Sequence, residues 1–219
     1  MSNDPNQNVA GRIEGLSAAK KALLAKRLKA AQSIPEAASA NVIPKISRAQ
    51  PIPASFSQER MWLNYLLNPC NIAYNSQVAL HFKGSLDVNA LRQTLNEIVR
   101  RHEICRTHLC EEEGRILQRI LPITEAPLCV EQCEASALRV RINEVISTPF
   151  QLDVGPLVRW TLLVVDDRTC TLVFTDHHAV TDGWSRRVVF REMMALYRYY
   201  HLQDTPYPLQ PPGDRKSVV

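Results

Sequence analysis

Two apolar runs on either side of a short polar turn restrict the fold of this chain more than any other feature. Residues 157–165 and 169–175 flank the turn at residues 166–168, and this pattern predicts a hairpin of two strands. The longest uncharged apolar stretches are short, as in residues 162–165, and fall well below the roughly 20 apolar residues that a membrane helix needs. We therefore expect a globular domain built around a sheet, with no membrane partner.

The other periodicities predict helices and strands that are intermixed along the chain. We expect further strands over residues 75–82, 104–109 and 115–121, and helices over residues 57–67, 88–99, 134–147 and 184–200. Ser57 and Asp87 are the expected caps of the first two helices. Because strands and helices do not alternate strictly, the pattern favours an α+β fold with a mixed sheet over a doubly wound fold.

The basic excess of the chain lies in its first 50 residues. They hold eight basic and three acidic residues, whereas the rest of the chain holds 18 basic and 19 acidic ones. The body therefore has no electrostatic signature of a nucleic-acid-binding protein.

The terminal segments are expected to lie outside the main domain. We expect residues 1–15 to be a disordered leader, residues 16–50 to form a basic amphipathic helix (16–31) and a linker, and residues 211–219 to form a tail. The helix could dock onto a partner protein or lean on its own domain, and we favour the second. The polar start lacks the apolar core of a signal peptide, so we expect a cytoplasmic protein.

The sequence predicts no directly bound cofactor and no metal. Its seven glycines form neither of the two glycine-rich arrangements that cradle phosphates. Its six cysteines contain no C-x-x-C pair, and in a cytoplasmic chain we expect them to be buried thiols.

Residues 175–185 are the segment most suited to chemistry, because they follow a predicted strand and precede a predicted helix. Strand alternation sends His177 and His178 to opposite faces, and histidine suits proton transfer near neutral pH. Asp182 can fold back to fix the local geometry, and Gly183 permits a tight turn. No G-x-S-x-G motif is present, which argues against a serine hydrolase of that kind. The alternative is a pair of histidines with only structural hydrogen bonds.

Four motifs follow one another in the chain. Residues 177–183 match H-H-x-x-x-D-G. Three earlier segments are similar to further motifs: residues 55–62 to S-x-A-Q-x-R-L-W, residues 101–107 to R-H-E-x-L-R-T, and residues 150–159 to F-x-L-x-x-G-P-L-x-R. Ser57 and Cys105 replace the usual Ala and Leu of two of them. In this order the motifs resemble those of the condensation domains of nonribosomal peptide synthetases, which belong to the chloramphenicol-acetyltransferase-like superfamily.

The resemblance implies a fold of two similar lobes with the active site in a tunnel between them. This chain has the length of one, so we expect the N-terminal lobe over residues 51–210, with the C-terminal lobe missing. A single lobe would expose an apolar face beside His178, and we expect it to self-associate and to be inactive alone.

The resemblance also implies the reaction. The amine of an acceptor aminoacyl thioester attacks the carbonyl of a donor acyl or peptidyl thioester and forms an amide bond. Both groups are carried on the phosphopantetheine arms of carrier proteins, so the expected partners are a donor and an acceptor peptidyl carrier protein.

The same resemblance assigns expected roles to six residues. His178 would take the proton from the attacking amine or hold the amine in place, and the Gly183 N–H would stabilise the oxyanion. His177 would be structural. Asp182 would form an ion pair with Arg106, with Arg101 as the other candidate.

Two alternatives stay open from the sequence. One is a non-catalytic module, either truncated or serving interactions, that keeps the fold. The other is a stand-alone acyltransferase of the same superfamily that uses soluble thioesters. Whether this chain is itself an enzyme is therefore not decided by its sequence.

Overall fold

The computed structural model describes residues 52–203 and 206–209, which all belong to one of the two units of the chain, residues 45–219. The predictions for the leader, the basic helix and linker up to residue 50, and the tail at residues 211–219 lie outside the described residues. The described part holds a four-stranded sheet, a three-stranded sheet and packed helices. This confirms the predicted α+β class with a mixed sheet.

The larger sheet has the strand order β2-β7-β6-β5 and contains the predicted hairpin. β6 (Val158–Asp166) and β7 (Thr169–His177) pair antiparallel, and β2 (Asn75–Lys83) pairs antiparallel with the other edge of β7. β5 (Leu128–Gln132), which no periodicity predicts, runs parallel to β6. β7 is therefore a central strand, and its end is held from both sides.

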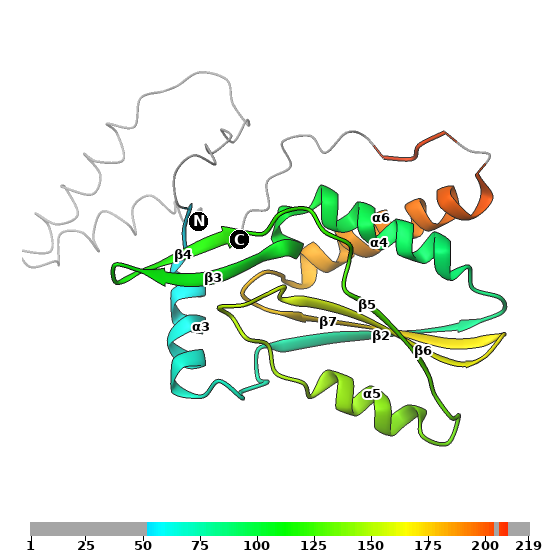
Figure 1. Ribbon diagram of the computed structural model, residues 1–219, viewed down its shortest axis with the longest axis horizontal. Coiled ribbons are helices and arrows are strands. Elements are labelled where there is room, and N and C mark those ends of the chain that lie inside the picture. Colours follow the sequence, from blue (N-terminus) through cyan, green and yellow to red (C-terminus); the bar gives the residue numbers. More distant parts are fainter. Residues whose placement is uncertain (1–51, 204–205, 210–219) are drawn as a thin grey trace, which may run out of the picture. The chain divides into compact units, whose positions relative to one another are not determined.

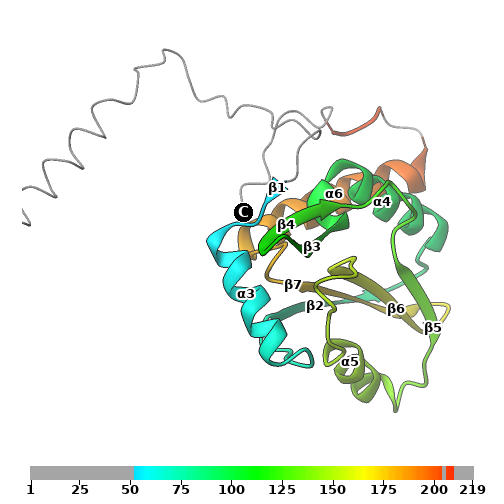
Figure 2. The ribbon, with the colours of Figure 1, turned by 60° about the vertical axis from the view of Figure 1, so that its left-hand side comes forward.

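Helices cover both faces of this sheet, as Figures 1 and 2 show. α4 (Val88–Arg101) and α6 (Gly183–Leu202) lie on one face, and α5 (Leu138–Ile146) lies on the other. Sheets covered on both faces have strands that are apolar almost throughout, which explains the apolar runs of β6 and β7. Asp87 caps α4, as predicted, by accepting a hydrogen bond from the backbone N–H of Ala90 at 2.9 Å.

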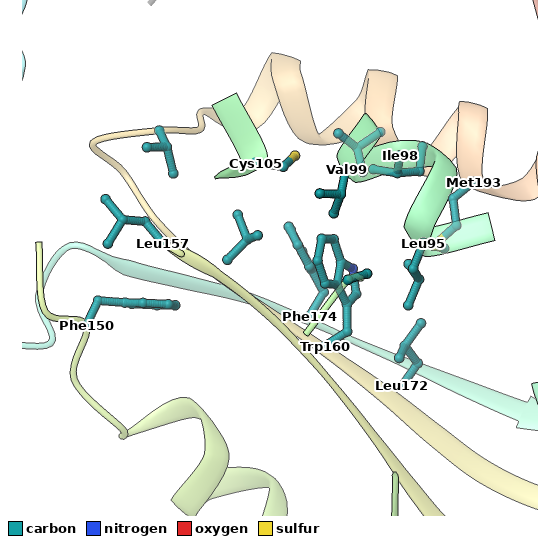
Figure 3. Packing of buried hydrophobic residues seen from close by; sticks show 14 of the residues in the cluster. Leu95, Ile98, Val99, Cys105, Phe150, Leu157, Trp160, Leu172, Phe174 and Met193 are labelled. Atoms are coloured by element: carbon teal, nitrogen blue, oxygen red, sulfur yellow. The ribbon is translucent and has the colours of Figure 1, made fainter. Parts of the chain in front are cut away.

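The main core lies between the sheet and the two helices α4 and α6 (Figure 3). Trp160 and Phe174 pack with their ring centroids 5.4 Å apart, and Leu95, Ile98 and Met193 close over them from the helices. Each of these side chains is buried, and a fully buried large apolar side chain contributes about 1.5–3 kcal/mol. This core fixes the end of β7 relative to the start of α6.

The smaller sheet has the order β1-β4-β3, formed by Ile52–Pro53, Arg115–Ile120 and Thr107–Glu112. Glu113 and Gly114, with φ of 51° and 75°, connect β3 to β4; two successive positive φ angles are typical of a type I′ hairpin turn. The 3-10 helix η1 (Glu103–Arg106) occupies the start of the strand predicted at residue 104.

α3 (Phe56–Leu67) follows β1, and its cap corrects a prediction. Ser55, rather than Ser57, is the N-cap, because the Ser55 hydroxyl accepts from the Gln58 backbone N–H at 3.3 Å. The Gln58 side-chain oxygen accepts from the Ser55 backbone N–H at 2.8 Å, which completes a reciprocal capping box.

The cysteines are free thiols, and only some of them are buried. Cys105 and Cys170 are buried as predicted, whereas Cys70 and Cys129 are exposed. The prediction of six buried thiols is therefore wrong for the exposed pair. Among the described residues, no helix combines the length and the apolar character needed to cross a membrane.

Candidate active site

The loop of residues 178–182 joins the end of β7 to the start of α6, and backbone hydrogen bonds fix its first half. The His177 N–H donates to the Leu157 carbonyl at 3.0 Å, and the His178 N–H donates to the Tyr74 carbonyl at 2.9 Å. The Val180 N–H closes a turn on the His177 carbonyl at 3.0 Å. These hydrogen bonds hold the backbone of both histidines in place at the end of β7.

Gln58 ties the first motif to this loop. Its side chain is 1% exposed, and its Nε2 donates to the Ala179 carbonyl at 2.9 Å. Its Oε1 is used in the capping box at Ser55, so both ends of the amide have partners. The first motif thus fixes the loop through a buried hydrogen bond, a role that was not expected from the sequence.

His178 is half-buried, and its ring is oriented by its own loop. Its Nδ1 lies 3.1 Å from the carbonyl oxygen of Thr181. A carbonyl can only accept, so Nδ1 carries the proton and the neutral ring keeps a lone pair on Nε2. This is the tautomer that a proton acceptor needs.

His177 has the opposite arrangement. Its side chain is 5% exposed, and its Nδ1 accepts from the Ala179 backbone N–H at 3.0 Å, so in the neutral ring the proton is on Nε2. Its ring lies near those of Phe150 and Tyr74. Burial, together with the neighbouring His178, lowers the pKa of His177 to about 4, so this side chain is neutral at pH 7.

Asp182 caps α6 rather than forming the predicted ion pair. Its Oδ1 accepts from the Ser185 backbone N–H at 2.7 Å, and its hydrogen bonds with Ser185 lower the pKa of this exposed carboxyl. Arg106 instead donates to the Leu121 carbonyl at 2.5 Å and lies 3.6 Å from Glu103. The expected pair of Asp182 with Arg106 or Arg101 is therefore not formed. The N–H groups at the start of a helix stabilise an anion as a cation would, and they satisfy Asp182.

Arg101 and His102 connect the second motif to α6 through Glu192. Arg101 Nε lies 3.1 Å and His102 Nε2 lies 2.9 Å from the same carboxylate oxygen of Glu192. Burial raises the pKa of Glu192, but hydrogen bonds with His102 and Arg101 outweigh it and hold the pKa at about 2. This ion pair attaches α6 to the end of α4.

Gly183 is the exposed first residue of α6, and a Cβ built on it meets no atom within 4 Å. Gly155 of the third motif, at residues 150–159, is the position where glycine is required. Its φ is +61°, and a Cβ there would come within 2.8 Å of the His108 Cβ.

Asp176 is a buried acid that was not expected to belong to the site. It is 0% exposed, it accepts a hydrogen bond from the Ser76 hydroxyl, and its second carboxylate oxygen, Oδ2, has no hydrogen-bond partner. The Nε of Arg186 lies 3.9 Å from that oxygen. An acidic residue within an apolar strand, directly before two histidines, is the signal that could have identified it. Among the described residues, no group of three or more potential metal ligands occurs.

Comparison with known proteins places these motifs in one family. The condensation domain family matches residues 48–212. Malpibaldin synthetase from Mortierella alpina is 33% identical over 177 residues, which are 78% of this chain and 3% of that protein.

Two solved structures have a similar fold. The starter condensation domain of rhizomide synthetase RzmA is 20% identical with a TM-score of 0.66, over 72% of this chain and 40% of that one. The X-domain in complex with OxyB, from teicoplanin biosynthesis, is 26% identical with a TM-score of 0.68, over 80% of this chain and 40% of that one. The chain thus spans a few per cent of the synthetase and about two fifths of the solved domains that it matches. The extent of the family match and the four motifs together show that the chain belongs to the condensation domain family of nonribosomal peptide synthetases.

Proposed function

We propose that this chain supplies the histidine-bearing part of a site that joins two thioester-bound groups through an amide bond. The observation that carries the proposal is the His178 ring, whose Nδ1 is used by the Thr181 carbonyl. The other ring nitrogen, Nε2, therefore keeps its lone pair and can accept a proton. His178 belongs to the H-H-x-x-x-D-G motif, which lies within the residues that the family model matches. A fixed ring with a free lone pair is suited to an incoming amine.

In the proposed reaction the amine nitrogen of the acceptor attacks the donor carbonyl. The new C–N bond forms, the C–S bond breaks, and the amine proton passes to His178 Nε2 and then to the departing sulfur. Positioning of the amine by His178 contributes alongside proton transfer, because a bound amine facing a bound thioester reacts as if the two were in one molecule.

The remaining predicted residues act around His178 in this proposal. The Gly183 N–H, at the N-terminus of α6, stabilises the oxyanion that forms on the donor carbonyl, aided by the helix dipole. His177 and Asp182 hold the two ends of the loop, through Ala179 and the first turn of α6. Arg101 and Arg106 support the site at a distance, through Glu192 and Leu121.

The proposed partners are a donor and an acceptor carrier protein, with the substrates bound to their phosphopantetheine arms. No cofactor is proposed to bind the chain itself. The described surface offers apolar contacts close to the site: Trp184 is 72% exposed at the start of α6. Phe56, Leu63 and Leu67 are also exposed, and their spacing places them on one face of α3. Such side chains favour burial against a partner.

A second candidate function is that of a non-catalytic binding module. It is favoured by the likeness to the X-domain, which was solved in complex with OxyB. In this case the exposed face of α3 and Trp184 would serve recognition, and His178 would have no chemical role.

The test separates these functions. Residues 48–212 replace the matched region in a homologous condensation domain, and product is measured by mass spectrometry with both carrier proteins loaded. We expect amide product from this chimera and a loss of about 10²-fold or more with His178→Ala, the usual contribution of a proton-transfer residue. Full activity of the His178→Ala chimera would contradict the proposed role of His178, and absence of product from the unsubstituted chimera would support the binding module instead.

Two further arms complete the experiment. The full chain assayed alone is expected to form product far more slowly than the chimera. Soluble thioesters replace the loaded carriers in a parallel reaction, and equal turnover with them would favour a stand-alone acyltransferase.

A further inference from the structure

Asp176 and His178 lie two residues apart at the end of β7, on the side of the sheet that α6 covers. Side chains alternate along β7, so Phe174 and Asp176 point to one side and His177 to the other. The N–H groups of His177 and His178 bond to opposite edges of the strand, at Leu157 and Tyr74, so the alternation continues to His178 and places its side chain on the side of Asp176. Phe174 on this side packs edge-on against Phe190 of α6, with ring centroids 5.6 Å apart. Asp176 is therefore the buried neighbour of His178 on the side of α6.

The surroundings satisfy the Asp176 carboxylate only in part. Ser76 lies directly opposite in the register of β2 and β7, and its hydroxyl donates to Oδ1. Oδ2 has no hydrogen bond, and Arg186 Nε is 3.9 Å away. A buried, half-satisfied carboxylate is costly for folding, and proteins keep such groups mainly where function requires them.

The charged or titratable groups close to the Asp176 carboxylate are one cation, Arg186, one histidine, His178, and one thiol, Cys105. Burial, followed by the charge of Asp176, raises the pKa of the Cys105 thiol of η1 to about 12, so this thiol is neutral. Thr181 of the loop and Ser76 of β2 present hydroxyls, and Arg186 of α6 presents the cation. Burial raises the pKa of Asp176 itself, and the hydrogen bond from Ser76, the nearby Thr181 hydroxyl, and the charges of Arg186 and His178 counteract this.

We propose that Asp176 is a positioning residue for His178, whose buried negative charge stabilises the protonated His178 ring during proton transfer. The proposal rests on the function proposed above, in which His178 takes the amine proton and passes it to the sulfur. Position 176 lies directly before the H-H-x-x-x-D-G motif and outside it, so the motif assigns this residue no role.

The test compares two acids that flank the same histidine. Asp176→Asn and Asp182→Asn each remove one negative charge at nearly constant volume, one buried and one exposed. The titration of the His178 ring is followed by NMR in the full chain. We expect Asp176→Asn to lower the His178 midpoint by about 1 pH unit, because charges interact strongly in a low-dielectric interior. Asp182→Asn should lower it by about 0.3 unit or less, since water and salt screen an exposed charge.

An unchanged or raised midpoint in Asp176→Asn would overturn the proposal, as would an equal or larger effect of Asp182→Asn. A measurement on the unsubstituted chain guards against a variant that does not fold. There the side-chain carboxyl ¹³C shift of Asp176 should be that of an ionised carboxylate from pH 8 to pH 6, and a protonated carboxyl in this range would contradict the proposal. Neither measurement needs turnover, so their failure is distinguishable from a failure of the condensation assay.

Discussion

His177 and His178 are adjacent in the sequence, yet the structure gives them opposite surroundings. His177 is 5% exposed, packs near Phe150 and Tyr74, and accepts a backbone N–H at Nδ1. His178 is half-buried and donates from Nδ1 to the Thr181 carbonyl. Strand alternation separates the rings, and the backbone partner of Nδ1 decides which nitrogen is left over. The comparison shows how one strand end supplies both a fixed support and an available proton acceptor.

The largest expected effect is on stability when each ring is removed. His177→Ala leaves a cavity and an unpaired Ala179 N–H, and we expect a loss of about 3–4 kcal/mol. His178→Ala should cost less than about 1 kcal/mol, because the ring is only half-buried. Urea unfolding of both variants at pH 7 measures the difference. Equal losses would contradict the difference in burial and hydrogen bonding between the two rings.

The pH dependence of stability sharpens the same comparison. The pKa of His177 is lowered from 6.5 to about 4 by burial and by His178, so the unfolded chain binds this proton more readily. Above pH 6.5 both states hold a neutral His177 and the free energy of unfolding is at its full value. As the pH falls from 6.5 toward 4, the unfolded chain takes up the proton first, and the free energy of unfolding falls by about 3 kcal/mol. Glu192, whose pKa is held at about 2, adds its own loss only below its ordinary value of 4.5.

This pH dependence is measured by urea unfolding between pH 7 and pH 4.5. His177→Gln should flatten the curve in this window, because it removes the group whose pKa differs between the folded and the unfolded chain. The same slope in His177→Gln and in the unsubstituted chain would refute the assignment.

The smallest effect concerns Asp182 at the other end of the loop. Because this carboxylate is exposed and caps α6, Asp182→Ala should cost about 1 kcal/mol, the usual value of an N-cap. The larger cost of a broken buried ion pair, about 3–5 kcal/mol, would be expected if Asp182 were paired with Arg106. Thermal unfolding of Asp182→Ala and Asp182→Ser distinguishes the two, since serine can still cap the helix.

Sequence patterns predicted the parts of the fold in which burial is periodic. The hairpin of β6 and β7 and the capped helix α4 have strong patterns and are found as expected. β5 was missed because its five residues have no regular alternation of buried and exposed positions. The start of β3 was misplaced because η1 has an apolar content like that of a strand.

The candidate site was predictable in its position but not in its contacts. The order of motifs identified the loop at residues 178–182, whereas the partners of its acids depend on tertiary packing. Asp182 turns to the helix N–H groups, and Asp176 is the acid that packing buries. Local spacing contains no information on which of two nearby carboxylates lies inside.

The central claim is that His178 presents a lone pair on Nε2, and the tautomers of the two histidines test it most directly. Long-range ¹H–¹⁵N correlation spectra of the full chain at pH 8 report which ring nitrogen carries the proton. The structure predicts a proton on Nδ1 of His178 and on Nε2 of His177. A His178 ring protonated mainly on Nε2 would contradict the account, because no lone pair would then face the incoming amine.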